Sequence, residues 1–133
     1  MMHLTKKIIL AFFLLTAISS FSTASFAAGK IENATMDEIK GFIDTTIERS
    51  EKVLAAIESG ADNETVLSLL NNVKQMAKEI HATKKAAVYK SKAGSQMKKA
   101  RIAAKKGDLD TAKPHVVKGL EFYRKLKEVF PGN

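Results

Sequence analysis

The side chains best suited to chemistry in this sequence are one histidine and four carboxylates that fall near two predicted turns. A histidine nitrogen together with carboxylate oxygens can bind a divalent cation, although tight binding of a transition metal usually requires more nitrogen or sulfur ligands. The sequence contains no Cys, so no thiolate can complete such a site. We therefore expect weak binding of a divalent metal ion (copper, zinc or nickel) by these residues: Asp62, Glu64, Asp108, Asp110 and His115.

The same acids also have a purely structural interpretation. An aspartate just before a helix accepts hydrogen bonds from the first free backbone amides, and Asp62, Asp108 and Asp110 all stand at such positions. The sequence contains no HExxH, no Gly-rich phosphate loop and no Ser–His–Asp pattern. We therefore expect a protein that is not an enzyme, and capping and metal binding both stay open at this point.

Residues 1–27 have the pattern of a secretory signal peptide. Lys6 and Lys7 precede a largely apolar run over residues 8–18, and the small residues Ser25 and Ala27 fit a cleavage site after Ala27. The alternative is an uncleaved anchor helix, but this run is shorter than the roughly 20 apolar residues that span a bilayer. We expect cleavage after Ala27 and a periplasmic protein consisting of residues 28–133.

Residues 28–133 predict an all-α domain. Apolar residues recur at spacings of three and four, and no alternating strand pattern is present. The first helix should begin after Thr35, which forms a Thr-x-x-Glu capping box, and should bury an apolar stripe on one face. That stripe consists of Ile39, Phe42, Ile43, Ile47, Leu54 and Ile57.

Glycines and caps mark the remaining helix boundaries. Gly60 and Gly107 should end the first and third helices. We place the middle turn at residues 81–83, with residues 94–95 as the competing site, and Pro114 in the first turn of the last helix. Four helices with short connections pack most simply as an antiparallel up-down four-helix bundle made of two helical hairpins, which brings both hairpin turns to one end.

The two hairpins carry opposite charge. The whole chain has a net charge of +8, but residues 30–80 carry six basic and ten acidic residues, whereas residues 81–133 carry fourteen basic and four acidic ones. The predicted third helix contains no acid at all. Its cations are Lys84, Lys85, Lys90, Lys92, Lys98, Lys99, Arg101, Lys105 and Lys106.

Nine like charges on one helix repel one another, so they require compensation. The compensation could be internal, from Asp37, Asp44, Glu48, Glu51 and Glu58 of the first helix. It could also come from an anionic partner, such as an envelope component or a membrane surface. Nucleic acid is disfavoured, because the protein is expected to be exported and this helix offers only Tyr89 for base stacking.

The stretch from residue 100 to residue 124 resembles the helical repeat of the small metal-binding protein family. The resemblance rests on Ala100, Gly107, Ala112, His115 and Leu120 at the family's spacing. It implies an exported protein of two helical hairpins that binds divalent transition metals, although most positions at which that family carries His are occupied here by other residues. The chain also resembles periplasmic four-helix b-type cytochromes, but it has no His in the last helix where they bind haem, so we expect no haem.

Overall fold

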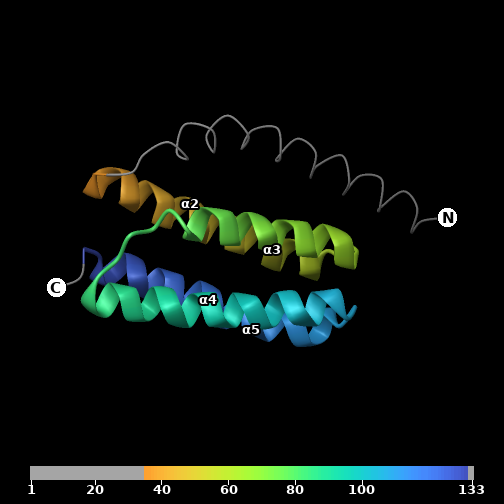
Figure 1. Ribbon diagram of the computed structural model, residues 1–133. Coiled ribbons are helices and arrows are strands. Elements are labelled where there is room, and N and C mark those ends of the chain that lie inside the picture. Colours follow the sequence, from red (N-terminus) through yellow and green to blue (C-terminus); the bar gives the residue numbers. More distant parts are fainter. Residues whose placement is uncertain (1–34, 132–133) are drawn as a thin grey trace. The chain divides into compact units, whose positions relative to one another are not determined.

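Four α-helices make up almost all of residues 35–131, the part of the chain that the computed structural model describes. They are α2 (Met36–Glu58), α3 (Asn63–Ala77), α4 (Lys84–Lys105) and α5 (Leu109–Val129). Each helix packs against the next along the chain, and α5 closes the ring by packing against α2 (Figure 1). This confirms the predicted all-α four-helix bundle. The predicted signal peptide over residues 1–27 lies outside the described residues.

Side-chain caps begin three of these helices. Thr35, Asp62 and Asp108 each accept a hydrogen bond from the backbone amide three residues later, at 3.2, 2.8 and 3.1 Å. Each bond satisfies an amide that has no partner within its helix. Thr83 precedes α4 in an extended conformation but makes no such bond. The capping interpretation of Asp62 and Asp108 is therefore confirmed.

The two hairpin turns have the same backbone design. Gly60 and Gly107 adopt φ angles of +82° and +79°, a region that a residue with a Cβ rarely enters. The amide after each glycine donates to the carbonyl four residues before that glycine, at 3.0 and 2.9 Å, which closes a Schellman motif. The cap of the next helix follows two residues after Gly60 but directly after Gly107.

Both hairpin turns lie at one end of the bundle, and the connection between α3 and α4 lies at the other (Figure 1). The first turn touches the second, because a Cβ added to Gly107 would lie only 2.9 Å from the side-chain nitrogen of Asn63. His81 lies in the α3–α4 connection, whereas His115 lies near the start of α5. The two histidines are therefore at opposite ends of the bundle.

The middle connection is longer than residues 81–83. Helix α3 already ends at Ala77, and α4 runs without a break through Gly94 and Ser95. The connection is held by Ile80, whose side chain is fully buried and whose carbonyl accepts a 2.6 Å hydrogen bond from Nζ of Lys90. Burial of this one side chain thus takes precedence over continuing the helix.

Pro114 lies inside α5, and the prediction that placed it in the first turn is wrong. It is the sixth residue of the helix, because α5 begins directly after the Asp108 cap. At that position the amide that proline lacks would have bonded the carbonyl of Asp110. Helix α5 therefore lacks one backbone hydrogen bond near its start.

The inner face of α2 is partly polar, unlike the apolar stripe predicted for it. Ile39 and Ile43 are buried as expected, but Thr46 and Ser50 are also fully buried. Their hydroxyls donate to the carbonyls four residues earlier, at 2.7 and 2.8 Å, so neither hydroxyl is buried without a partner. The other stripe residues are only half-buried: Phe42, Ile47, Leu54 and Ile57.

Helices α4 and α5 pack more closely than any other pair in the bundle. The residues that α4 buries are mostly alanines, and α5 offers Ala112 and Gly119 in return. A Cβ on Gly119 would lie 2.7 Å from Cε of Met97, so the two backbones approach as closely as these side chains allow. The buried face of α4 therefore consists mainly of small side chains, and most of its lysines are exposed.

Candidate functional site

The acids predicted to bind metal lie at the hairpin-turn end, where two of them already serve as caps. Both carboxylate oxygens of Asp108 accept hydrogen bonds from Thr111, at 3.1 and 2.6 Å, and these bonds lower the pKa of Asp108. Asp108 also lines a surface groove together with Lys99 and Lys106. Two ammonium groups beside this carboxylate repel a divalent cation.

His115 is directed towards α4 rather than towards these acids. Its Nδ1 lies 2.8 Å from Oε1 of Gln96, and its side chain is half-buried. Within residues 35–131 no three His, Asp or Glu side chains come close enough to hold a metal ion. The structure therefore does not bring the five predicted ligands together. Metal binding by them stays a prediction.

The cations of α4 lack acidic partners within residues 35–131. The two ion pairs in this range join α5 to α2: Arg124 to Glu51 at 3.0 Å and Lys127 to Asp44 at 2.8 Å. Helix α2 packs against α3 and α5, so two of the acids expected to offset α4 are paired with a different helix. Both pairs are more than half exposed and contribute little to stability.

One face of α4 combines lysines with the helix's exposed apolar residues. Four lysines recur along it every seven residues, about 10.5 Å apart. A second set, Val88, Ser95 and Ile102, follows the first three of these lysines by three positions. Val88 and Ile102 belong to that second set and are 51% and 45% exposed. We call this face the outer stripe, and it consists of Lys85, Val88, Lys92, Ser95, Lys99, Ile102 and Lys106.

An aromatic pair lies beside the outer stripe, between α4 and α5. The rings of Tyr89 and Phe122 stack with their centres 6.4 Å apart, and both side chains are half-buried. Nζ of Lys92 lies 5.8 Å from the centre of the Phe122 ring, and Nζ of Lys125 lies 5.9 Å from that of Tyr89. These ammonium groups thus remain near the surface over apolar rings.

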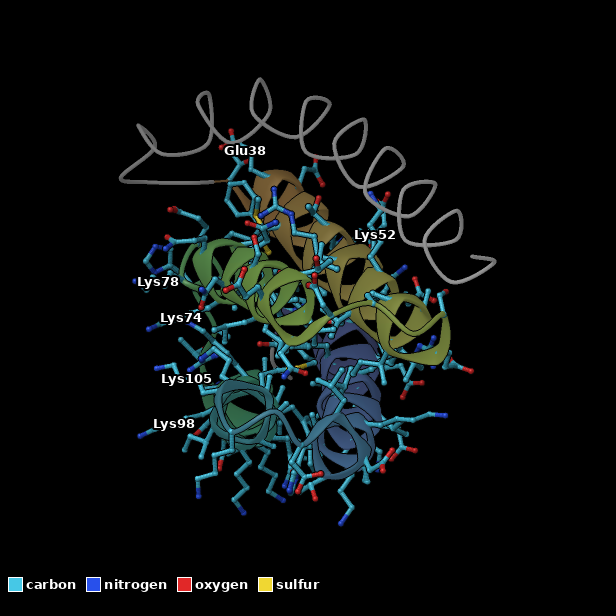
Figure 2. All side chains as sticks on the ribbon, turned by 90° about the vertical axis from the view of Figure 1, so that its right-hand side faces the viewer. Glu38, Lys52, Lys74, Lys78, Lys98 and Lys105 are labelled. Carbon is cyan, nitrogen blue, oxygen red and sulfur yellow. The ribbon has the colours of Figure 1, made fainter. Side chains whose placement is uncertain are left out.

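Two predicted cations, Lys90 and Arg101, face α3 instead. They line an open surface pocket of about 220 Å³ together with Lys74 of α3 and Lys78 at its C-terminal end. We call it the α3–α4 pocket, and its other described lining residues are Ala77, Gly94, Met97 and Tyr123. Figure 2 shows Lys74 and Lys78 projecting on the same side of the bundle as Lys98 and Lys105 of α4.

Burial changes the proton affinity of two side chains in this pocket. It lowers the pKa of Lys90, whose ammonium donates to the Ile80 carbonyl. It raises the pKa of Tyr123 to about 12, an effect that the nearby Arg101 guanidinium partly opposes. The phenol therefore keeps its proton at neutral pH and is available as a hydrogen-bond donor.

Sequence reasoning found the cations of α4 but missed the contribution of α3. Lys74 and Lys78 are four residues apart and so share one face of α3, a signal present in the sequence. Tyr123, which lies on the buried face of α5, was not among the predicted site residues. Lys74, Lys78 and Tyr123 lie around one pocket with Arg101 because α3 packs beside α4, and no local sequence pattern encodes that packing.

Comparison with known proteins gives no relative: no protein-family model, no curated protein and no solved structure matches the chain. The resemblances to the small metal-binding proteins and to the b-type cytochromes therefore stay predictions. The function has to be argued from the residues themselves. Within the described part of the chain, no helix is long and apolar enough to cross a membrane.

Proposed function

We propose that this protein is a non-enzymatic binding protein that docks on an anionic membrane surface through the outer stripe of α4. The observation that carries the proposal is the combination on one exposed helix face of four lysines without acidic partners in the described chain and two exposed apolar residues, Val88 and Ile102. With the predicted signal peptide, that surface is the periplasmic face of the inner membrane.

The outer stripe has the dimensions and charge for this task. Helix α4 has 22 residues, which corresponds to a length of about 33 Å. A lysine near an anionic lipid surface contributes about 1 kcal/mol, so the four lysines of the stripe together supply about 4 kcal/mol. Attraction of this size gives reversible binding that depends on salt.

The apolar residues of the stripe favour a lipid surface over a soluble polyanion. Val88 and Ile102 gain little beside a polysaccharide, but at a bilayer they can reach the boundary between head groups and acyl chains. The Tyr89–Phe122 pair, flanked by Lys92 and Lys125, adds aromatic rings of the kind enriched at that interface. An acidic protein partner is the competing outcome of the test below.

Sedimentation with vesicles tests the proposal. The protein should pellet with vesicles that contain phosphatidylglycerol at low salt, and should be released by 0.5 M NaCl or when the vesicles contain only phosphatidylcholine. Changing Lys85, Lys92 and Lys99 to Glu together should weaken binding at least a hundredfold, because each reversal removes an attraction of about 1 kcal/mol and adds a repulsion.

A matched control distinguishes the effect of the outer stripe from the effect of the protein's net charge on vesicle binding. The triple variant with Lys40, Lys113 and Lys118 changed to Glu alters the charge equally but leaves the outer stripe intact. It should bind much more tightly than the stripe variant. Equal loss in both variants, or no binding of the unaltered protein to anionic vesicles, would refute docking through this face.

A further inference from the structure

The α3–α4 pocket is separate from the outer stripe and calls for its own ligand. None of its lining residues belongs to the stripe, so a ligand can bind the pocket whether or not the outer stripe docks on a membrane. Four cations from two helices line it, and its described lining contains no acidic side chain. Such a concentration of positive charge around one cavity is most stable when an anion occupies the cavity.

The chemistry of the lining indicates what kind of anion fits. Arg101 offers a planar guanidinium fork, which pairs with two oxygens of a phosphate or carboxylate group. Lys74 and Lys78 are exposed at the rim, whereas Lys90 is half-buried and already donates to the Ile80 carbonyl. Several cations around one cavity suit a doubly charged phosphate better than a singly charged carboxylate.

Tyr123 adds a neutral donor from within the bundle. Its side chain is only 1% exposed, lines the pocket, and makes no hydrogen bond to any residue in the range 35–131. A phenol that keeps its proton can donate to a phosphate oxygen without requiring a counter-charge. Ala77, Gly94 and Met97 supply an apolar wall beside it.

The size of the pocket limits the ligand. A volume of about 220 Å³ corresponds to roughly seven water molecules and is smaller than the pockets that hold drug-sized molecules. It therefore accommodates a phosphate group with only a few attached carbon atoms. Larger parts of a ligand must extend past Lys74 and Lys78 into solvent or into a lipid surface.

We propose that the α3–α4 pocket binds a phosphate monoester group, with Arg101, Lys74 and Lys78 pairing with its oxygens and Tyr123 donating a hydrogen bond. The group can belong to a small soluble phosphomonoester or to a lipid head group of the phosphatidic acid type. Both sources present the same terminal phosphate to the pocket, and separate arms of one experiment distinguish them.

Nuclear magnetic resonance titration of the ¹⁵N-labelled protein tests the proposal. The backbone amide of Gly94, in the pocket wall, should shift saturably with glycerol 3-phosphate if the source is soluble. If the source is a lipid, the shift should appear only with short-chain phosphatidic acid. Sodium chloride at the same ionic strength should leave this signal in place.

Matched variants test whether the chemical shift change reports binding in the α3–α4 pocket. Changing Lys74 and Lys78 to Ala together should weaken binding at least tenfold, whereas the same change at Lys85 and Lys92 of the outer stripe should alter it less than threefold. Gly94→Leu keeps every charge and places a bulky side chain on the pocket wall, where no atom lies within 4 Å of a Cβ to prevent it. It should abolish the shift that the phosphate ligand causes, which in this variant is followed at the backbone amide of Tyr123. Tyr123→Phe should weaken binding about fivefold.

The outcomes discriminate between this proposal and membrane docking. No saturable shift with either phosphate source, or equal weakening in the pocket and stripe variants, would overturn the pocket assignment. Binding to vesicles that contain phosphatidic acid, if lost in the stripe variant but unchanged in the pocket variants, would leave membrane docking intact while rejecting a lipid source for the pocket. Circular dichroism should confirm that the Gly94 and Tyr123 variants remain helical.

Discussion

Gly119 shows how one residue sets the distance between two helices. It lies on the buried face of α5, where a Cβ would come within 2.7 Å of Cε, 3.1 Å of Sδ and 3.2 Å of Cγ of Met97. Met97 is itself 1% exposed, and because its Cγ and Sδ as well as its terminal Cε lie this close, moving the methyl group alone would not relieve the clash. Close packing at this point requires the absence of a side chain.

Gly119→Ala should therefore destabilise the protein. Overpacking a tight core costs about 1–3 kcal/mol, of which the better helix propensity of Ala returns at most about 1 kcal/mol. Gly41→Ala is the control, because a Cβ on Gly41 meets no atom within 4 Å and should raise the free energy of unfolding by up to about 1 kcal/mol. Urea unfolding of both variants measures the difference, and shifts of the same sign would contradict the packing argument.

At the scale of an element, α4 and α5 are stabilised in different ways. Helix α4 carries a run of repelling cations, so its stability depends on alanines and Met97 packed against its neighbours. Helix α5 has a good cap at Asp108 but contains Pro114 in its second turn, where a backbone bond to the Asp110 carbonyl is missing. The start of α5 is accordingly the part of that helix with the weaker backbone bonding.

Replacing this proline should strengthen α5. Pro114→Ala restores a backbone amide at an exposed position, and we expect a gain of about 1–3 kcal/mol after allowing for the loss of proline's stiffening of the unfolded chain. Lys113→Ala, at the exposed neighbouring position, should change stability by less than about 0.5 kcal/mol. Thermal and urea unfolding of the two variants provide the comparison. A Pro114 variant no more stable than the Lys113 variant would show that proline costs α5 nothing.

At the scale of the whole molecule, charge is distributed by helix. Helix α2 carries more acids than any other helix, α4 carries cations and no acid, and the two ion pairs within residues 35–131 lie between α2 and α5. Repulsion within α4 therefore outweighs the attraction that these two exposed pairs provide. This distribution gives the bundle one strongly cationic side.

Added salt should consequently stabilise the protein. Raising NaCl from 10 mM to 0.5 M reduces the screening length from about 30 Å to about 4 Å, which relieves the repulsion in α4 more than it weakens two surface pairs. We expect Tm to rise by several degrees, because an increase of about 1 kcal/mol in the free energy of unfolding raises Tm by that much in a domain of this size. In the variant with Lys92 and Lys99 changed to Glu, Tm should rise less on adding salt, because fewer like charges repel one another in α4. A fall in Tm on adding salt would show that attractive pairs dominate instead.

Much of the fold could be predicted because it depends on local rules. Thr35, Asp62 and Asp108 are caps by virtue of their own side chains, and Gly60 and Gly107 end helices because a positive φ costs glycine little. The regular apolar spacing predicted four amphipathic helices, and four such helices with short connections pack most simply as a four-helix bundle. The errors came where a distant contact decided the outcome, as at Ile80, which lies fully buried in the α3–α4 connection after α3 has ended at Ala77.

The candidate sites likewise depend partly on local sequence and partly on contacts between helices. By itself the sequence determined the four helices, the side-chain caps of three of them and the nine cations from Lys84 to Lys106, because spacing, side-chain chemistry and charge are properties of the chain. Only the tertiary structure decided that Lys99 of α4 lines one groove with Asp108, that His115 meets Gln96, and that α3 joins its lysines to Arg101 and Tyr123 around one pocket. These are contacts between helices, and they depend on how each helix is rotated against its neighbour, which buried volume determines and no local pattern records.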